Sequence, residues 1–216
     1  MQYKAVLFDL DGTLLDTLGD IHSAVNVALE KHAFAPRTLA EVRSFVGNGV
    51  KKLIERALPQ GTAPDIVEAC LADFTADYDR HMNVLTRPYD GIAEVLCVLK
   101  AQGVKIAVVS NKYDSAAKAL VEAHFGGLAD LCLGTLKNVP AKPAPNTANM
   151  ALAAFGIDRS EAAYVGDSGV DCQTAANAGL PFFGVTWGFW DKDRLAAAGE
   201  HAALCDTAAQ LLERLI

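Results

Sequence analysis

The apolar positions of this chain form short continuous runs, each of which ends at polar or turn-forming residues. Six such runs predict strands, at 5–8, 104–110, 130–134, 162–167, 181–186 and, with a less continuous pattern, 201–206. Continuous runs of this length are typical of strands buried on both faces, whereas half-exposed strands alternate apolar and polar residues. The pattern therefore predicts a parallel sheet covered by helices on both sides.

Stretches with helical spacing of apolar residues separate these runs. They predict helices at about 90–102, 113–124, 144–155, 169–178 and 206–215. Gly103, Gly156 and Gly179 directly follow three of them, where glycine commonly ends a helix. Strands that alternate with helices predict an α/β fold with a doubly wound, Rossmann-like parallel sheet.

One segment breaks the alternation, because the chain from Asp16 to about Met82 has helical spacing and no convincing strand. Helices are predicted at 38–46, 50–58 and 65–82, after a first one that begins near residue 18. We therefore expect an all-helical cap domain at 16–87, inserted into an α/β core made of 1–15 and 88–216. Two linkers that join an insertion to a core favour a hinge.

Composition narrows the classes of partner. The 216 residues carry a net charge of −7, which argues against non-specific binding to nucleic acid or to an anionic membrane. An anionic small molecule stays possible because one local basic pocket would suffice. No apolar run approaches the length of a membrane span, and the N-terminus has no signal-peptide pattern. The odd count of five cysteines, without a C-x-x-C pair, favours free thiols and a cytoplasmic protein.

The first predicted strand leads directly into the carboxylates of the stretch VLFDLDGTLLDT, which runs from Val6 to Thr17. Asp9 and Asp11 are two residues apart, so in an extended chain their side chains point to the same side. Like charges this close repel, so one must take up a proton or a cation must lie between them. The stretch therefore predicts a bound cation.

Polar residues also follow the other predicted strands. Ser110 and Asn111 follow the second, Lys142 lies in the loop after the third, and Asp167 and Asp171 follow the fourth. Ligands of open parallel sheets bind beyond the carboxyl ends of the strands, so these groups are expected at one edge. Carboxylates, a hydroxyl, an amide and an ammonium group together suit a divalent cation and a phosphate.

Four short motifs carry a resemblance to a known family. They are DLDGT at 9–13, VSNK at 109–112, KP at 142–143 and GDSGVD at 166–171. In this order and context the chain resembles the haloacid dehalogenase superfamily, in particular its phosphoglycolate phosphatase-like members with a helical cap. The resemblance covers nearly the whole chain and implies a phosphatase.

The resemblance implies a role for each acidic residue. Asp9 would be the nucleophile that forms an aspartyl-phosphate, and Asp11 the general acid and base, although an Asp before a Gly is also common in turns. Mg²⁺ would be bound by the Asp9 and Asp167 carboxylates and the Asp11 backbone carbonyl. Asp171 would act through a water or a neighbouring ligand, or else be an ordinary aspartate in the first turn of a helix.

The remaining motif residues are expected to bind the phosphate. Ser110 and Asn111 would donate hydrogen bonds to it, and the backbone around Gly12 would form part of an anion-binding turn. Lys142 would lie against Asp9 and the phosphoryl oxygens, offsetting their charge. Lys112, the last residue of the VSNK motif, is expected to be peripheral.

The cap is expected to recognise the organic end of the substrate. Gly47, Asn48 and Gly49 precede a predicted helix that bears Lys51, an arrangement that could bind the carboxylate of a small acid such as 2-phosphoglycolate. A plain turn between helices, with solvated lysines, explains the same residues equally well.

Three other functions fit parts of the pattern. A phosphomutase would use the same aspartyl-phosphate, and a catalytically silent module could bind a phosphorylated ligand. A phosphonatase is disfavoured because such enzymes usually lack an acid at the position of Asp11. The expected partner is a small phosphorylated metabolite, with no nucleic acid and no membrane, and the chain is expected to be a monomer or a homodimer.

Overall fold

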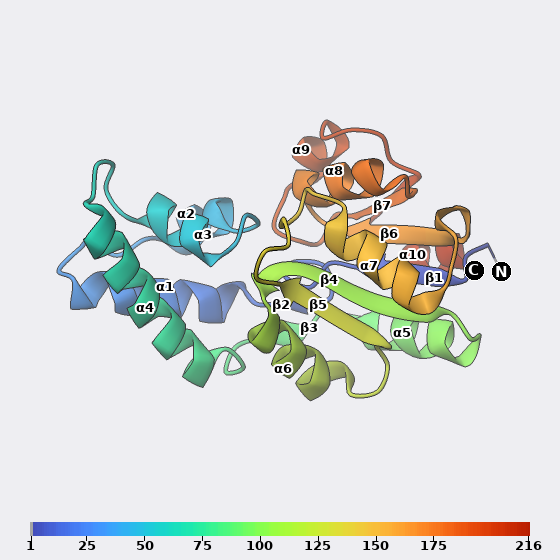
Figure 1. The fold of residues 1–216 in the computed structure, drawn as a ribbon, viewed down its shortest axis with the longest axis horizontal. Helices are drawn as coiled ribbons and strands as arrows, with labels where there is room; N and C mark the ends of the chain where they lie inside the picture. Colours follow the sequence, from blue (N-terminus) through green and yellow to red (C-terminus); the bar gives the residue numbers. More distant parts are fainter. Residues whose placement is uncertain (1) are drawn as a thin grey trace.

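The centre of the molecule is a six-stranded parallel sheet in the order β5-β4-β1-β6-β7-β8 (Figure 1). The computed structural model describes residues 2–216. The strands are β1 (Ala5–Phe8), β4 (Lys105–Tyr113), β5 (Leu131–Thr135), β6 (Ala162–Gly166), β7 (Phe182–Val185) and β8 (Ala203–Cys205). The predicted parallel α/β sheet is thus confirmed.

Strand β1 lies in the interior of the sheet, between β4 and β6. Ala5 pairs with Lys105 on one side and with Ala162 on the other. All four residues of β1 are buried, which is why its sequence is continuously apolar. Asp9 follows directly, and its amide donates to the Val165 carbonyl at 2.9 Å, so the first acidic residue starts at the sheet edge.

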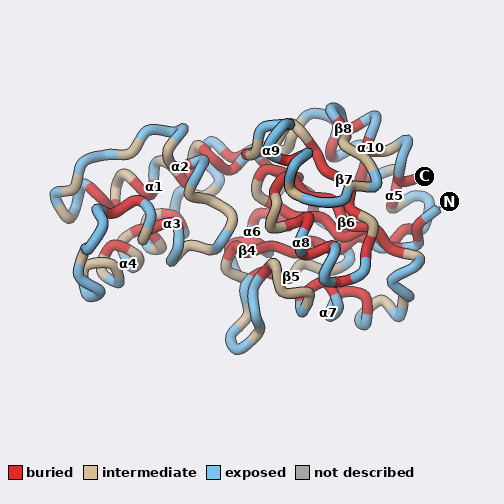
Figure 2. Tube along the Cα trace, turned by 90° about the horizontal axis from the view of Figure 1, so that it is seen from above, coloured by how far each residue is buried: buried red, intermediate tan, exposed pale blue. Residues whose placement is uncertain are grey.

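Helices cover both faces of the sheet. Buried side chains from α5 (Ile92–Ala101), α6 (Asp114–Phe125) and α10 (Ala208–Leu215) pack with Val6 and Phe8 on one face. Side chains from α7 (Asn146–Phe155), α8 (Gly169–Ala178) and α9 (Lys192–Ala196) pack with Ala5 and Leu7 on the other. A 3-10 turn, η1 (Arg159–Glu161), precedes β6. Figure 2 shows the buried trace concentrated along the strands between these layers.

Four helices form a separate cluster beside the sheet, at the left of Figure 1: α1 (Leu18–Lys31), α2 (Leu39–Phe45), α3 (Val50–Ala57) and α4 (Pro64–His81). They pack around their own apolar core, which includes Val25, Leu29, Ile54 and Phe74. Thr38 begins α2 with a reciprocal pair of hydrogen bonds to Glu41, and Pro64 stands in the first turn of α4. This is the helical cap that the sequence predicts.

The cap joins the core through two chain segments that pair with each other. β2 (Leu15–Asp16) and β3 (Arg87–Pro88) form a two-stranded antiparallel ribbon in which Asp16 faces Arg87. We infer that the domain boundaries lie within this ribbon, with the cap at 16–87 and the core at 1–15 and 88–216.

The main difference from the expected elements is at the end of β4. The strand, expected to end at 110, continues to Tyr113, where the helix was expected to begin, and Tyr113 still pairs with Thr135 of β5. Gly134 permits this extension, because a Cβ there would overlap the backbone of Lys112 and Asp114. The extension carries Asn111, Lys112 and Tyr113 toward the cap.

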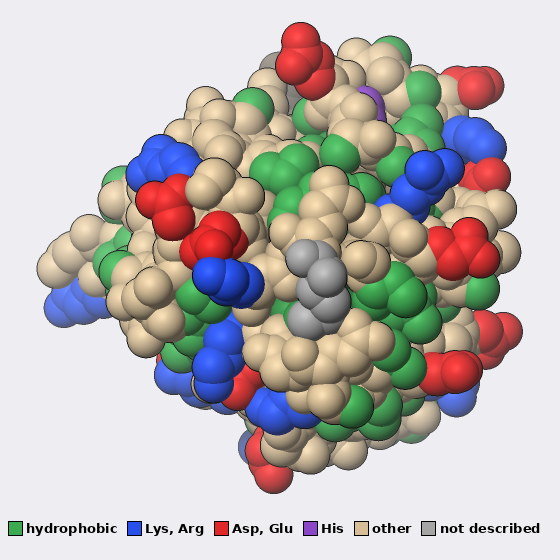
Figure 3. Space-filling view, turned by 90° about the vertical axis from the view of Figure 1, so that its right-hand side faces the viewer, with side chains coloured by type: hydrophobic (Ala, Val, Ile, Leu, Met, Phe, Trp, Pro, Cys, Tyr) green, Lys and Arg blue, Asp and Glu red, His purple; other side chains and the backbone are tan. Residues whose placement is uncertain are grey.

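The mixture of acidic and basic side chains on the surface is consistent with the net charge of −7. Figure 3 views the end of the core that lies away from the cap, and acidic and basic side chains are interspersed on it. Within residues 2–216, no helix is both long enough and apolar enough to cross a bilayer.

Candidate functional site

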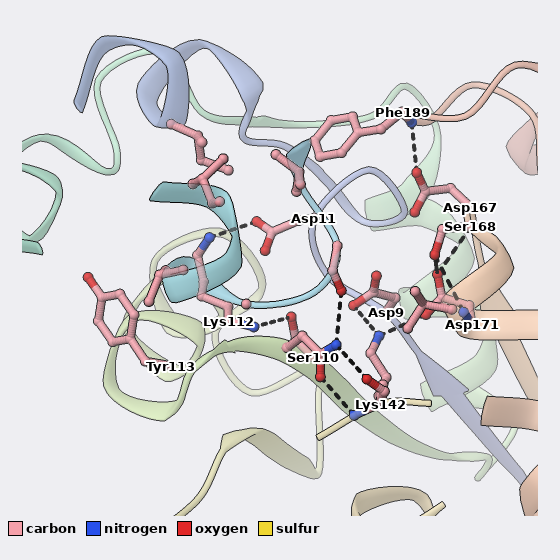
Figure 4. Close-up of a pocket in the computed structure, with 18 of the residues that line it drawn as sticks. Asp9, Asp11, Ser110, Lys112, Tyr113, Lys142, Asp167, Ser168, Asp171 and Phe189 are labelled. Carbon is pink, nitrogen blue, oxygen red and sulfur yellow. Dashed lines mark hydrogen bonds and ion pairs between the residues drawn. The ribbon is translucent and has the colours of Figure 1, made fainter. Parts of the chain in front are cut away.

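The carboxyl ends of β1, β4 and β6 open into a cavity of about 60 Å³ between core and cap (Figure 4). Its core wall contains the predicted groups Asp9, Asp11, Ser110, Asn111, Lys142, Asp167 and Asp171. Its cap wall contains Gly47 and Gly49 together with the apolar side chains of Val50, Leu53 and Phe74. Residues from four separate motifs therefore meet in one enclosed space.

Three carboxylates and one ammonium group form the floor of the cavity. Oxygens of Asp9, Asp167 and Asp171 lie within 4.8 Å of one another. The Lys142 ammonium lies 2.8 Å from Asp9 Oδ1 and 2.7 Å from Asp171 Oδ1. Burial, followed by the Asp171 charge, raises the pKa of Asp9 to about 7 against the opposing effect of Lys142. The ammonium group of Lys142 alone is thus not enough to keep the carboxyl groups of this cluster ionised.

Asp167 is held in place by two groups that the motif analysis did not single out. The Thr13 hydroxyl donates to Asp167 Oδ1 at 3.1 Å, and the Phe189 amide donates to Asp167 Oδ2 at 2.7 Å. Burial and the charges of Asp171 and Asp9 still raise the pKa of Asp167 well above its ordinary value. Thr13 belongs to the DLDGT motif and could have been noticed, but Phe189 acts through its backbone, for which the sequence has no signal.

The donor set fits a divalent cation. The charges that line the cavity are four carboxylates and two ammonium groups, namely Asp9, Asp11, Asp167, Asp171, Lys112 and Lys142. Asp9 Oδ1 is buried and accepts no hydrogen bond from the described residues beyond its ion contact with Lys142. An excess of buried carboxylate oxygens is what a hard ion such as Mg²⁺ requires.

Both carboxylate oxygens of Asp171 accept hydrogen bonds from other residues of the protein. Its Oδ1 accepts from Lys142, and its Oδ2 accepts from the Ser168 hydroxyl at 2.5 Å in a reciprocal cap of α8. The structure confirms Asp171 as an aspartate in the first turn of a helix and places its carboxylate beside those of Asp9 and Asp167.

Asn111 uses its side-chain amide to connect three parts of the chain. Its Oδ1 accepts from the Lys142 amide at 2.9 Å, and its Nδ2 donates to the Lys142 carbonyl at 3.0 Å and to the Gly47 carbonyl at 2.9 Å. Asn111 thus fixes the backbone of Lys142 and contacts the cap loop. Its side-chain donors are committed to these carbonyls, which differs from the expected side-chain bond to phosphate.

Ser110 and Gly12 contribute in different ways. Ser110 is buried at the cavity wall, and its hydroxyl oxygen accepts from the Lys112 amide at 3.1 Å, which leaves its hydrogen to donate. The Gly12 amide instead donates to the Leu15 carbonyl at 2.9 Å, so it is not directed at a phosphate as we expected. Gly12 has φ +86°, and a Cβ there would overlap the Asp167 carboxylate, so glycine is needed for close approach.

Lys112 is not peripheral, and this expectation was wrong. The residue is only 6% exposed, and its ammonium lies 2.8 Å from Asp11 Oδ1. The same Asp11 oxygen accepts from the Thr17 hydroxyl at 2.6 Å, at the start of the cap. Burial lowers the pKa of Lys112, but the Asp11 charge and Tyr78 outweigh burial and raise it above its ordinary value. A lysine that keeps its charge therefore lies beside the predicted general acid.

The cap loop reaches the cavity by its backbone and not by its polar side chains. Gly47 and Gly49 line the cavity, whereas Asn48 is exposed and accepts from Arg56 at 2.8 Å. Lys51 is also exposed and pairs with Glu68 at 2.6 Å. Lys51 is therefore directed to solvent and to α4, while the buried residues of α3 are those at 53, 54 and 57.

Comparisons with known proteins show the family and the fold. The model of the haloacid dehalogenase-like hydrolase family matches residues 6–185. A phosphoglycolate phosphatase of Cereibacter sphaeroides is 39% identical over 189 residues, which are 85% of each chain. One of Neisseria meningitidis serogroup A is 35% identical over 200 residues, 89% of this chain and 84% of that protein. A crystal structure from Lactobacillus delbrueckii subsp. bulgaricus superposes with a TM-score of 0.95 and 34% identity, over 100% of this chain and 99% of that one.

Proposed function

The chain belongs to the haloacid dehalogenase-like hydrolases and is a phosphatase, and on this premise we propose that it hydrolyses 2-phosphoglycolate or a similar small phosphorylated acid. Similarity to relatives named phosphoglycolate phosphatase supports the choice of substrate. The small cavity supports a compact organic group in preference to a nucleotide or a sugar chain.

The observation that carries the proposal is the position of Asp9 at the floor of the cavity, 2.8 Å from Lys142. In the first step an Asp9 oxygen bonds to phosphorus, the ester P–O bond breaks, and the leaving oxygen takes a proton from Asp11. In the second step a water gives its proton to Asp11, its oxygen bonds to phosphorus, and the aspartyl-phosphate bond breaks. The products are the alcohol and inorganic phosphate.

Residues around Asp9 would stabilise the charge that moves during these steps. Lys142 would lie against the phosphoryl oxygens, and the Ser110 hydroxyl would donate to one of them. A bound Mg²⁺ would be held by the carboxylates of Asp9 and Asp167 and the Asp11 backbone carbonyl, and it would offset the negative charge of these groups and of the phosphate. Thr17 and Lys112 would keep the Asp11 carboxylate in place.

The test is a measurement of phosphate release across phosphoglycolate, sugar phosphates, nucleotides and pyrophosphate, with and without Mg²⁺. We expect the highest kcat/KM for phosphoglycolate and loss of turnover on chelation with EDTA. Equal rates on all esters would contradict the substrate, and full activity after exhaustive chelation would contradict the metal.

The same assays separate the alternatives. A phosphomutase would interconvert glucose 1-phosphate and glucose 6-phosphate without releasing phosphate. A silent binding module would leave p-nitrophenyl phosphate intact in the presence of Mg²⁺. Nothing in the site favours this module, since each of the predicted catalytic groups is present at the cavity.

We also propose a cytoplasmic location and a monomer or homodimer. All five cysteines are free thiols, which a reducing compartment would maintain. Size-exclusion chromatography with light scattering would determine the oligomeric state, and a state larger than a dimer would contradict the proposal.

A further inference from the structure

The cavity has two buried lysines, and only one of them is committed wholly to the acidic cluster. Lys142 contacts both Asp9 and Asp171. Lys112 has one carboxylate partner, Asp11, although an ammonium group carries three donors. No other lysine or arginine is among the described residues that line the cavity. Among the described lining residues, Lys112 is therefore the side-chain cation most available to a second anionic group on a substrate.

Tyr78 of cap helix α4 lies beside this lysine. The Lys112 ammonium is 4.8 Å from the centre of the Tyr78 ring. The ring is fixed by stacking on Phe74, with centres 5.4 Å apart, and by an edge contact with Tyr113 at 6.5 Å. Tyr78 is 1% exposed, and its hydroxyl has the Lys112 ammonium as a polar neighbour but forms no hydrogen bond of good geometry with any described residue.

A buried hydroxyl without a partner costs free energy, so its retention in a ligand cavity indicates that a ligand supplies the partner. Burial raises the pKa of Tyr78 to about 12, so the hydroxyl keeps its proton and can donate. Lys112 and Tyr78 thus present two donors, one from the core and one from the cap, to the same part of the cavity.

The position of Lys112 relative to Asp11 sets the length of the ligand. Asp11 must lie at the ester oxygen in order to protonate it. Lys112 contacts Asp11 directly, so a short ester whose leaving oxygen lies at Asp11 can also place an anionic group against Lys112. In 2-phosphoglycolate a single methylene group separates the ester oxygen from the carboxylate.

We propose that Lys112 and Tyr78 form the receptor for the carboxylate of the substrate, and that they determine its specificity. The inference rests on the proposed phosphatase function and assigns to these two residues the role that was one of two interpretations of Lys51 and its loop in the sequence. The carboxylate bridges the core, through Lys112, and the cap, through Tyr78, so a substrate that carries it holds the two domains together over the reaction site. Esters that lack the carboxylate cannot contact Lys112 and Tyr78 at the same time, so they do not link the two domains in this way.

The experiment compares kcat/KM for 2-phosphoglycolate and for ethyl phosphate, a short alkyl ester that lacks the carboxylate. A variant that changes the chemical steps through Asp11 affects both esters alike. Dividing kcat/KM for 2-phosphoglycolate by kcat/KM for ethyl phosphate therefore cancels this effect. For Lys112→Met we expect this ratio to fall about 10- to 100-fold, mostly through KM, because a charge-assisted contact is lost. For Tyr78→Phe, which keeps the ring packing, we expect a fall of about 3- to 10-fold. Lys51→Met is the matched control and should keep the wild-type ratio.

Product inhibition gives a second readout that does not depend on turnover of the carboxylate ester. Glycolate should inhibit hydrolysis of ethyl phosphate by the wild type, and it should inhibit Tyr78→Phe and Lys112→Met more weakly. If Lys112→Met does not fold, Tyr78→Phe decides.

The outcomes separate the two proposals. An unchanged substrate ratio and unchanged glycolate inhibition in Tyr78→Phe and Lys112→Met would overturn the receptor while leaving the phosphatase intact. Wild-type protein that hydrolyses neither ester would overturn the proposed substrate. In that case calorimetric titration with glycolate decides on the receptor, which is overturned if the wild type binds glycolate no better than Lys112→Met.

Discussion

The Asp20 carboxylate near the start of α1 accepts hydrogen bonds from both the amide and the hydroxyl of Thr86, at 2.8 and 2.7 Å. It also accepts from the amides of Val84 and Leu85. Asp20 is therefore a buried side chain whose partners all come from the segment that returns from the cap to the core. The two connections of the cap are tied to each other, so they are expected to move as one unit.

Replacing Asp20 should weaken this connection. In Asp20→Asn the new amide nitrogen would face backbone donors, so we expect a loss of about 1–3 kcal/mol in the free energy of unfolding. Urea denaturation measures the loss, and limited proteolysis should show faster cleavage at 83–86. Glu213→Gln, on the exposed side of α10, is the control and should change neither quantity. A variant as stable and as protease-resistant as the wild type would show that the tie is dispensable.

The acidic cluster predicts how stability depends on pH and Mg²⁺. The pKa of Asp9 is about 7 in the folded metal-free protein, above its ordinary value, so the folded state retains a proton that the unfolded state loses. Stability that is present at low pH is therefore lost as the pH rises through about 7. Bound Mg²⁺ supplies the positive charge that Asp9 loses with its proton. The rise in Tm that Mg²⁺ causes should therefore be larger at pH 8 than at pH 6.

Thermal denaturation of EDTA-treated protein, with and without added Mg²⁺, checks this dependence. Asp167→Asn removes one of the repelling charges and one expected ligand. Its metal-free form should lose less stability as the pH rises, and Mg²⁺ should no longer raise its Tm. A Mg²⁺ effect of equal size at the two pH values would contradict the proposed metal site.

The nucleophile has its own test. Asp9→Asn should lower kcat by at least about 10³-fold, because an amide oxygen cannot form the phosphoenzyme. Wild-type protein mixed with substrate should yield a phosphorylated species that hydroxylamine cleaves, and the variant should yield none. Circular dichroism should show that the variant is folded. Comparable turnover in Asp9→Asn and its parent would refute the mechanism.

The role of Asp11 predicts a dependence on the leaving group. Asp11→Asn should lower kcat on alkyl phosphates by about 10²–10⁴-fold, because their oxygen must be protonated as it leaves. The loss on p-nitrophenyl phosphate should be much smaller, since p-nitrophenolate leaves without a proton. Parallel losses on both kinds of ester would mean that Asp11 acts in positioning and not in proton transfer.

Gly12 provides a test of the close approach between the first and fourth motifs. Its backbone has φ +86°, and a Cβ would overlap the Asp167 carboxylate. Gly12→Ala should therefore weaken Mg²⁺ binding, measured by calorimetry, in addition to lowering stability. Gly61→Ala is a close control, because Gly61 also has φ +86° but has nothing within 4 Å of the added carbon. Equal metal affinity in the two variants would exclude a role for this contact.

Much of the fold was predictable because its signals are local. β1 is buried on both faces, so its residues are continuously apolar, and parallel strands bring the residues after their carboxyl ends to one edge of the sheet. Lys112 was misjudged because its direction depends on how far β4 continues, which is set by pairing with β5 and by Gly134. Phe189 contributes an amide, and the Tyr78 hydroxyl lacks a partner only in the folded protein. Such relationships arise from tertiary packing.

The interior position of β1 also has a consequence for biosynthesis. β1 leaves the ribosome well before its neighbours β4 and β6, which begin at Lys105 and Ala162. The nascent chain must therefore carry an unpaired apolar segment while the cap helices, most of whose core residues lie within 18–81, can already associate. Until β6 emerges, this apolar segment lacks one of its two neighbouring strands, and Asp9, directly after it, is without the other acidic residues of its cluster.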